Sequence, residues 1–352
     1  MTMNDQKSFN EIPTLDVAPL IAGPQDPAYS DCVRTLADAA HHVGFAQLIG
    51  HGLEGRQARL LDATRRFFAL PEAEKMQVYI GNSDNHRGYV PFGEEIMASG
   101  IPDTKEAFDL SLDLPPEHPA VKAGTPLLGP NQWPRLEGFR ESVMDYYDAV
   151  FALGKVIFRA FAVGLGQDPE LFLRYVSTPP SQLRLLHYPN NEDAVDRPGI
   201  GEHTDYECFT LLKPTAPGLE VFNTDGEWIS VPYDPDALVL NIGDLLELWT
   251  NGYYVATSHR VRKVRQERYA FPLFFTVDYH TEVAPLEAFK DAAGSDNARA
   301  VVSGEHLRAQ TMQSFRYMLE RLQRGEASLP TDALPYYSLG REAETLEPQR
   351  SR

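Results

Sequence analysis

The stretch "GIGEHTDYECFTLL", residues 199–212, places His203 and Asp205 two positions apart in a run of strand-forming residues. On a β-strand, side chains two positions apart project from the same face and lie about 6–7 Å apart along the chain. Three interpretations of the pair are open: two ligands of one metal ion, an acid–base pair, or two polar residues on the solvated face of a sheet. The first interpretation requires a further ligand elsewhere in the chain.

The composition is that of an acidic globular protein. The chain has 352 residues, of which 43% are apolar, and its formal net charge is −18. Nucleic-acid binding depends on clustered Lys and Arg, so the charge argues against a nucleic-acid partner. No run approaches the roughly 18 apolar residues of a membrane span, and no secretory signal pattern is visible. Two cysteines, Cys32 and Cys208, are too few for a disulfide framework, which predicts a cytoplasmic location.

The periodicity of apolar residues predicts helices around one β core, in a single domain over residues 1–352. An N-terminal α/β region is expected over residues 12–115, and a long supporting helix over 140–166, where apolar residues recur on one side of the helical wheel. Short β-rich runs separated by turn-forming residues predict a sandwich or barrel over 183–283, which includes the quoted stretch. A final helix is expected over 305–324.

A third ligand for the metal interpretation is His259, which follows an apolar, aromatic run in the same predicted β core. Strands distant in sequence can lie side by side in an antiparallel sandwich. Two histidines and one carboxylate on adjacent strands form the facial triad that binds Fe(II) and leaves positions open for O2 and an electron donor. The same donors suit catalytic zinc, and two unrelated structural histidines are the alternative. The other histidines are expected in structural roles: His41 and His42 at a helix end, His51 in a turn, His86 and His118 in polar loops, and His306 on a surface helix.

Longer stretches around these residues follow the pattern of a known family. They are "HTDYECFTLL" (203–212), "PGLEVFNTDGEWISVPYDPDALVLNIGDLLELWTNGYYVATSHRV" (217–261) and "ERYAFPLFF" (267–275), preceded in the expected order by "IPTLDVAPL", "GFAQLIGHG", "FFALPEAEK" and "RGYVPFGEE". Over roughly residues 12–279 the chain resembles the isopenicillin N synthase-like family of non-haem Fe(II)/2-oxoglutarate-dependent oxygenases, in its bacterial-type members. The resemblance implies a mainly β fold with flanking α-helices, whose core is a double-stranded β-helix, a distorted, cupin-like jelly roll.

The resemblance also implies a set of site residues. His203, Asp205 and His259 take the places of the catalytic iron ligands, and Fe(II), 2-oxoglutarate and O2 are the implied cofactor and cosubstrates. Arg268 holds the position of the arginine that binds the distal carboxylate of 2-oxoglutarate, a role that suits its planar fork of donors. Tyr188 matches a tyrosine whose hydroxyl reaches the cosubstrate. The implied activity is oxidation of a small-molecule metabolite by hydroxylation, desaturation or ring closure, with release of succinate and CO2.

Two positions depart from the family pattern. Many relatives carry Arg-x-Ser where this chain has Ala270, and Leu186 replaces an asparagine of the plant members. These departures keep one alternative open, an iron-dependent oxidase of the isopenicillin N synthase type that does not use 2-oxoglutarate. A second alternative, from a different class, is a non-catalytic jelly-roll ligand-binding protein, which loss of an iron ligand or of Arg268 would favour; neither is lost here. No membrane partner is expected, and the sequence predicts neither the prime substrate nor the oligomeric state.

Residues that select the substrate are expected near the predicted metal site. Segments 87–95 and 102–109 and the C-terminal helix are loop-rich or terminal regions where specificity typically resides. Glu207 is a further candidate, because strand alternation places it on the same face as His203 and Asp205, where it can receive an amine or hydroxyl of the substrate. The alternative is that the strand bends after Tyr206 and turns Glu207 toward a loop or the surface.

Overall fold

The computed structural model describes residues 8–96, 105–189, 200–262, 266–290 and 300–330, and the statements below refer to these residues. The larger of two main sheets has the strand order β1-β2-β10-β7-β12-β5-β4-β3, in which only the β1–β2 pair is parallel. Its strands are β1 (Thr14–Asp16), β2 (Phe45–Ile49), β3 (Gly88–Val90), β4 (Glu106–Leu110), β5 (Gln182–Tyr188), β7 (Phe209–Pro214), β10 (Leu238–Ile242) and β12 (Arg268–Phe275).

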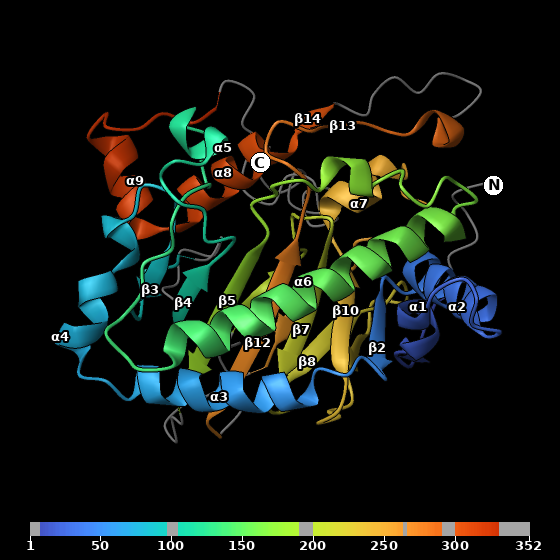
Figure 1. The fold of residues 1–352 in the computed structure, drawn as a ribbon. Helices are drawn as coiled ribbons and strands as arrows, with labels where there is room; N and C mark the ends of the chain where they lie inside the picture. The colour runs from blue at the N-terminus through green and yellow to red at the C-terminus, as the bar shows by residue number, and fades with distance from the viewer. Residues whose placement is uncertain (1–7, 97–104, 190–199, 263–265, 291–299, 331–352) are drawn as a thin grey trace.

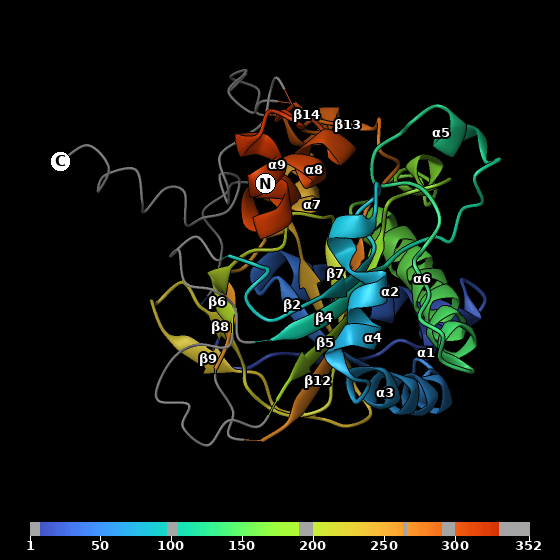
Figure 2. The ribbon, with the colours of Figure 1, turned by 90° about the vertical axis from the view of Figure 1, so that its left-hand side faces the viewer.

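The smaller main sheet has four antiparallel strands in the order β6-β11-β8-β9. It lies on the side of the larger sheet that faces away from helix α6 (Figure 2). Two facing antiparallel sheets with helices outside are the jelly roll expected from the sequence. The strands are β6 (Ile200–His203), β8 (Leu219–Phe222), β9 (Trp228–Ser230) and β11 (His259–Val261), and a separate pair joins β13 (Glu282–Val283) to β14 (Val301–Val302).

Helices cover the outer face of the larger sheet. Helix α6 (Phe139–Gly164), close to the expected range of 140–166, crosses this face. Helices α3 (Glu54–Phe68) and α2 (Tyr29–His42) pack beside it (Figure 1). A Cβ atom on Gly154 would lie 2.4 Å from the ring of Phe275, so glycine permits the close approach of α6 to the sheet. The other helices are α1 (Ala18–Ala22), α4 (Glu72–Lys75), α5 (Pro119–Lys122), α7 (Asp244–Trp249), α8 (Ser303–Ser314) and α9 (Arg316–Gln323).

Strand β12 connects the helix-backed core to the interior of the jelly roll. Alternate residues of a strand project from opposite faces. The odd-numbered residues of β12 belong to the main hydrophobic core, and the ring of Phe275 stacks on that of Phe151 with centroids 5.1 Å apart. Its even-numbered residues, which start with Arg268, line a cavity between the two sheets. The strand therefore anchors the fold on one face and presents side chains to the interior on the other.

The N-terminal region contributes directly to this arrangement. Strands β1 to β4 fall within the predicted α/β region of residues 12–115, and all four belong to the larger sheet. The β core is therefore larger than the predicted segment 183–283. No helix in the described part of the chain is both long enough and apolar enough to cross a membrane.

The stretch that contains His203 and Asp205 is two strands rather than one. Strand β6 ends at His203 and β7 begins at Phe209, so Asp205 and Glu207 lie in the connection between them. The carbonyl of Asp205 accepts a hydrogen bond from the backbone N–H of Asp244 at 2.8 Å, and that of Glu207 accepts from Leu245 at 3.1 Å. These N–H groups begin helix α7, and they draw the connection out of the sheet.

The predicted C-terminal helix over 305–324 is wrong as a single element, because α8 and α9 are separated at Phe315, which is extended (φ −103°, ψ 131°). Phe315 forms a β-bridge with Glu95, and its ring packs against His86 at a centroid distance of 4.5 Å. The prediction of a surface position for His306 is also wrong, since the residue is buried. Both faces of α8 are covered, which removes the exposed face that a surface helix would have.

Candidate metal centre and adjoining cavities

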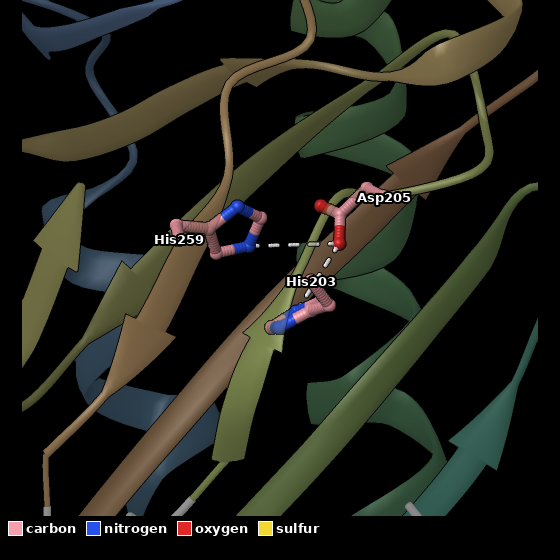
Figure 3. A group of neighbouring side chains, drawn as sticks. All are labelled: His203, Asp205 and His259. Atoms are coloured by element: carbon pink, nitrogen blue, oxygen red, sulfur yellow. Dashed lines mark ion pairs between the residues drawn. The ribbon is translucent and has the colours of Figure 1, made fainter. Parts of the chain in front are cut away.

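His203, Asp205 and His259 converge at the end of the small sheet. His203 is the last residue of β6 and pairs in register with His259, the first residue of β11. The Nε2 atoms of both histidines lie 3.7 Å from Oδ1 of Asp205 (Figure 3). In the described part of the chain, this is the one group of three His, Cys, Asp or Glu residues whose ligand atoms lie within 4.8 Å of one another.

The two imidazole rings are oriented by main-chain carbonyls. Nδ1 of His203 lies 2.8 Å from the carbonyl oxygen of Gly201, and Nδ1 of His259 lies 3.2 Å from that of Thr257. A carbonyl only accepts, so each Nδ1 carries the proton and donates it. Each Nε2 is then left with a lone pair, which is how metal-binding histidines are commonly fixed in proteins.

The carboxylate of Asp205 is held from its far side. Its Oδ2 accepts hydrogen bonds from Nδ2 of Asn241 at 2.7 Å and from Oγ1 of Thr210. Both partners are buried, on strands β10 and β7 of the larger sheet. Oδ1 therefore faces the two histidines. Asp205 lies outside the larger sheet, but two residues of that sheet fix the rotation of its carboxylate.

The charges in this cluster favour ligand forms that bind a metal. Burial raises the pKa of Asp205, but His259, His203 and the hydrogen bonds from Thr210 and Asn241 outweigh it, and the net pKa lies below its usual value. Burial, together with the neighbouring His203, lowers the pKa of His259 to about 4. At neutral pH the carboxylate is therefore ionised and His259 is neutral, which are the protonation states that coordinate a cation.

A cavity between the sheets joins this cluster to Arg268. It has an empty volume of about 800 Å³, including its open mouth. Alternation predicts that the even-numbered residues of β12 face the barrel interior, and all four of them line this cavity: Arg268, Ala270, Pro272 and Phe274. Tyr188 of β5 and the three residues of the cluster, His203, Asp205 and His259, line the cavity as well.

Arg268 is a buried cation with unused hydrogen-bonding capacity. It is 1% exposed, and its Nε and Nη1 have no hydrogen-bond partner among the described residues. The guanidinium carbon lies 5.0 Å from the ring centre of Tyr188, whose hydroxyl also lacks a partner there. Burial lowers the pKa of Arg268 and raises that of Tyr188 to about 12. Unpaired buried donors are costly, so this corner of the cavity suits a carboxylate that accepts from both side chains.

The two departures from the family pattern meet beside this corner. Ala270 pairs in register with Leu186, and both residues line the cavity. With Val90 and Ala107 they belong to a buried apolar cluster that also includes Tyr188. The cavity wall next to Arg268 is therefore apolar where many relatives place a hydroxyl and an amide.

Glu207 faces the cavity although it lies outside a strand. Strand β6 ends at His203, so Glu207 lies in a connection, as the alternative interpretation expected, but its side chain is 8% exposed and lines the cavity rather than the surface. Burial, reinforced by the charge of Asp205, raises the pKa of its carboxyl well above the usual value. Cys208 is buried in the main core.

A network of buried ion pairs forms the cavity wall near Glu207. Arg184 donates from Nε and Nη2 to the two carboxylate oxygens of Asp109, both at 2.8 Å, and from Nη1 to Glu95 at 3.2 Å. Lys105 donates to Glu95 at 2.8 Å. Burial lowers the pKa of Arg184, but Asp109 and Glu95 reverse this effect and raise it well above its usual value.

Only part of this wall was predicted from the sequence. Glu95 and Lys105 fall in the segments expected to select substrate, whereas positions 102–104 lie outside the described residues. Asp109 also falls in these segments, at the end of 102–109, whereas Arg184 and Asn241 were missed. A signal was present, because each is a polar residue between two aliphatic neighbours in a strand, and such residues need a partner when buried.

A two-histidine, one-carboxylate cluster inside a jelly roll defines a mononuclear metal enzyme, because three protein ligands leave room on the metal for reactants. Family models identify the kind of enzyme. Residues 12–136 match the N-terminal region described as "non-haem dioxygenase in morphine synthesis", and residues 172–277 match the 2OG-Fe(II) oxygenase superfamily.

Individual relatives agree with these matches. Clavatol oxidase of Penicillium crustosum is 33% identical over 330 residues, covering 86% of this chain and 96% of the relative. Homoarginine-6-hydroxylase of Glycine max is 33% identical over 326 residues, covering 87% and 98%. The crystal structure of a Neurospora crassa protein in complex with alpha-KG, that is, 2-oxoglutarate, superposes with a TM-score of 0.72 at 26% identity, covering 89% of this chain and 96% of that one.

The chain belongs to the 2OG-Fe(II) oxygenase superfamily. It is an Fe(II)- and 2-oxoglutarate-dependent dioxygenase that oxidises a small-molecule metabolite, uses O2 and releases succinate and CO2. The comparisons favour this activity over the two alternatives that the sequence left open, the 2-oxoglutarate-independent oxidase and the non-catalytic binding protein.

Proposed function

We propose that His203, Asp205 and His259 bind the Fe(II) of this dioxygenase through Nε2, Oδ1 and Nε2. The observation that carries the proposal is the proximity of these atoms, which lie within 4.8 Å of one another. It is supported by the hydrogen bonds that hold the far side of each ligand, because such outer partners set the orientation and tautomer of metal-binding side chains. Two imidazoles and one carboxylate are the ligand set of non-haem Fe(II) oxygenases.

We also propose that Arg268 and Tyr188 bind the distal carboxylate of 2-oxoglutarate. The unpaired Nε and Nη1 of Arg268 and the unpaired hydroxyl of Tyr188 are buried at one end of the cavity that contains the proposed iron ligands. A planar guanidinium forms two charge-assisted hydrogen bonds with one carboxylate. The apolar side chains of Leu186 and Ala270 exclude water beside this pair, which strengthens its electrostatic interaction with the cosubstrate.

These positions indicate which steps depend on the bound groups and which on the protein. Fe(II) and 2-oxoglutarate, when bound, supply the oxidative chemistry, because cofactors of this kind carry the electrons that O2 requires. The protein positions them: β6 and β11 hold the histidines, β12 holds Arg268, and Asn241 fixes Asp205.

The substrate is proposed to be a free small molecule rather than a nucleic acid, in line with the net charge of −18. The cytoplasm is the proposed compartment, in line with two unpaired, buried cysteines.

Anaerobic titration with Fe(II) tests the proposed ligands. Wild-type protein is expected to bind one Fe(II) per chain, and His203→Ala and His259→Ala are expected to lose most of the affinity, because each removes one of three protein ligands. His280→Ala is the control, since this histidine is exposed and is not part of the cluster. Stoichiometric Fe(II) binding in both ligand variants would contradict the assignment.

A further inference from the structure

A second cavity adjoins the one that contains the proposed iron and 2-oxoglutarate sites. It has an empty volume of about 490 Å³ and shares with the first cavity the residues Arg184, Tyr206, Glu207 and Phe274. Helix α8 and the break after it complete its wall with Leu307, Thr311 and Phe315. Arg268 and Tyr188 line only the first cavity, so the second extends away from the 2-oxoglutarate site and offers space for the molecule to be oxidised.

Glu207 lies where the two cavities meet and is not paired with a cation. Its side chain is 8% exposed, and no cationic nitrogen of the described residues lies within 4.0 Å of its carboxylate. A buried carboxylate without an ion-pair partner is costly unless a bound molecule supplies one.

Two cations of the first cavity, Arg184 and Lys105, are already paired with other carboxylates. Arg184 uses Nε, Nη1 and Nη2 on Asp109 and Glu95, and Lys105 donates to Glu95. Arg87, which lines the second cavity, donates from Nη1 and Nη2 to the backbone carbonyls of three residues, Asn85, His86 and Leu127, and its Nε has no partner among the described residues. Glu207 is the carboxylate of the described walls of the second cavity, and it lies at the junction with the first cavity.

We propose that Glu207 determines the specificity of this dioxygenase by binding a basic nitrogen group of its substrate, an amine, amidine or guanidine, at the junction of the two cavities. The inference rests on the proposed function only in that the first cavity is occupied by iron and 2-oxoglutarate. A nitrogen cation forms charge-assisted hydrogen bonds with the carboxylate and stabilises its ionised form against the burial that favours the neutral acid, which neutral and anionic groups of the same size do not. The rest of the substrate then occupies the second cavity, against Phe274, Leu307 and Phe315.

Three probes of nearly equal shape test this proposal: benzamidine, a cation; benzamide, its neutral counterpart; and benzoate, an anion. Their dissociation constants are measured by calorimetry on anaerobic protein saturated with Fe(II) and 2-oxoglutarate, so that Arg268 is unavailable to benzoate. Formation of the iron–2-oxoglutarate absorption band is checked first. An absent band would indicate failure of the proposed function rather than of the Glu207 assignment.

We expect wild-type protein to bind benzamidine at least about tenfold more tightly than benzamide, because a hydrogen bond to a charged group contributes more than one between neutral groups. Benzoate is expected to bind most weakly of the three. Glu207→Gln keeps the size of the side chain and is expected to bring the first two probes within about twofold of each other. Glu305→Gln is the matched control, because Glu305 lies on α8 but lines neither cavity. The Glu305→Gln protein should bind the three probes in the same order of affinity as the wild-type protein.

Two results would overturn the proposal. One is a wild-type protein that binds benzamidine no better than benzamide, or not at all at millimolar concentration, while the absorption band forms normally. This result depends on no variant and stands even if Glu207→Gln fails to fold. The other is a folded Glu207→Gln protein that keeps the wild-type preference for benzamidine.

Discussion

Asn241 donates a hydrogen bond from Nδ2 to Oδ2 of Asp205 at 2.7 Å, while Oδ1 of the same carboxylate lies 3.7 Å from Nε2 of both His203 and His259. A residue of the larger sheet thus orients a carboxylate that projects toward the smaller sheet. The relationship couples the helix-backed half of the jelly roll to the proposed metal centre.

Loss of this hydrogen bond is predicted to weaken iron binding. Asn241→Ala leaves Oδ2 of Asp205 with Thr210 as its remaining side-chain partner, so the carboxylate can rotate away from the histidines. We expect the dissociation constant for Fe(II), measured by anaerobic competition titration, to rise about 10–100-fold. Asn131→Ala removes a buried asparagine that bonds to the backbone of Ser111 and lines neither cavity, and should leave the constant unchanged. Equal constants for the two variants would refute this role of Asn241.

The buried pair of Asp109 and Arg184 is predicted to matter for stability. Asp109 is 0% exposed and accepts two hydrogen bonds from Arg184 at 2.8 Å, so Asp109→Asn leaves the guanidinium undercompensated. The free energy of unfolding in urea is expected to fall by about 3–5 kcal/mol. Asp145→Asn is the control, because Asp145 also pairs with two arginines but its side chain is 40% exposed. Its loss should cost about 0–1 kcal/mol. Similar costs for both variants would show that burial does not decide the effect.

His306 is predicted to make the protein sensitive to acid. Burial lowers its pKa to about 4, and neither ring nitrogen has a hydrogen-bond partner among the described residues. The unfolded chain, in which the pKa is about 6.5, binds the proton more readily between these values. Stability is therefore lost as the pH falls from about 6.5 to about 4, by about 3 kcal/mol in total.

His306→Phe tests this prediction, because it removes the titrating group without breaking a hydrogen bond. The difference in unfolding free energy between the variant and wild type should shift in favour of the variant as the pH falls from 7 to 4. Other groups titrate in both proteins, and their contributions cancel in the difference. A difference that does not change with pH would mean that His306 has the same pKa in the folded protein as in the unfolded chain, and would contradict the prediction.

The parts of the structure that were predicted correctly depend on short-range patterns. His203 and Asp205 are two residues apart, and the inward face of β12 follows from simple alternation beginning at Arg268. The parts that were missed depend on sheet register. Arg184 meets Asp109 because β4 and β5 place them directly opposite one another, and Asn241 reaches Asp205 from a strand that begins 33 residues later in the chain.

The C-terminal region shows a second limit of sequence patterns. The apolar stripe over 305–324 predicts a helix but gives no sign of where tertiary contacts break it. The backbone is extended at Phe315. As a result, the N–H of the next residue, Arg316, donates to the carbonyl of Glu94, and the N–H of Ile96 donates to the carbonyl of Ser314. Local propensity for helix is thus overridden by pairing with a segment more than 200 residues earlier in the chain.

The central claim of the account is that 2-oxoglutarate binds between the proposed iron ligands and Arg268. Its most direct test is an anaerobic titration of Fe(II)-loaded protein with 2-oxoglutarate, followed through the metal-to-ligand charge-transfer band. We expect wild-type protein to develop a saturable band and, once O2 is admitted, to form succinate. Arg268→Ala leaves the distal carboxylate without its buried partner, at a cost of about 3–5 kcal/mol, or roughly two to four decades in affinity. Arg268→Lys should recover only part of this, because lysine keeps the charge but not the planar fork. A 2-oxoglutarate affinity that is the same in wild-type and Arg268→Ala protein would contradict the claim.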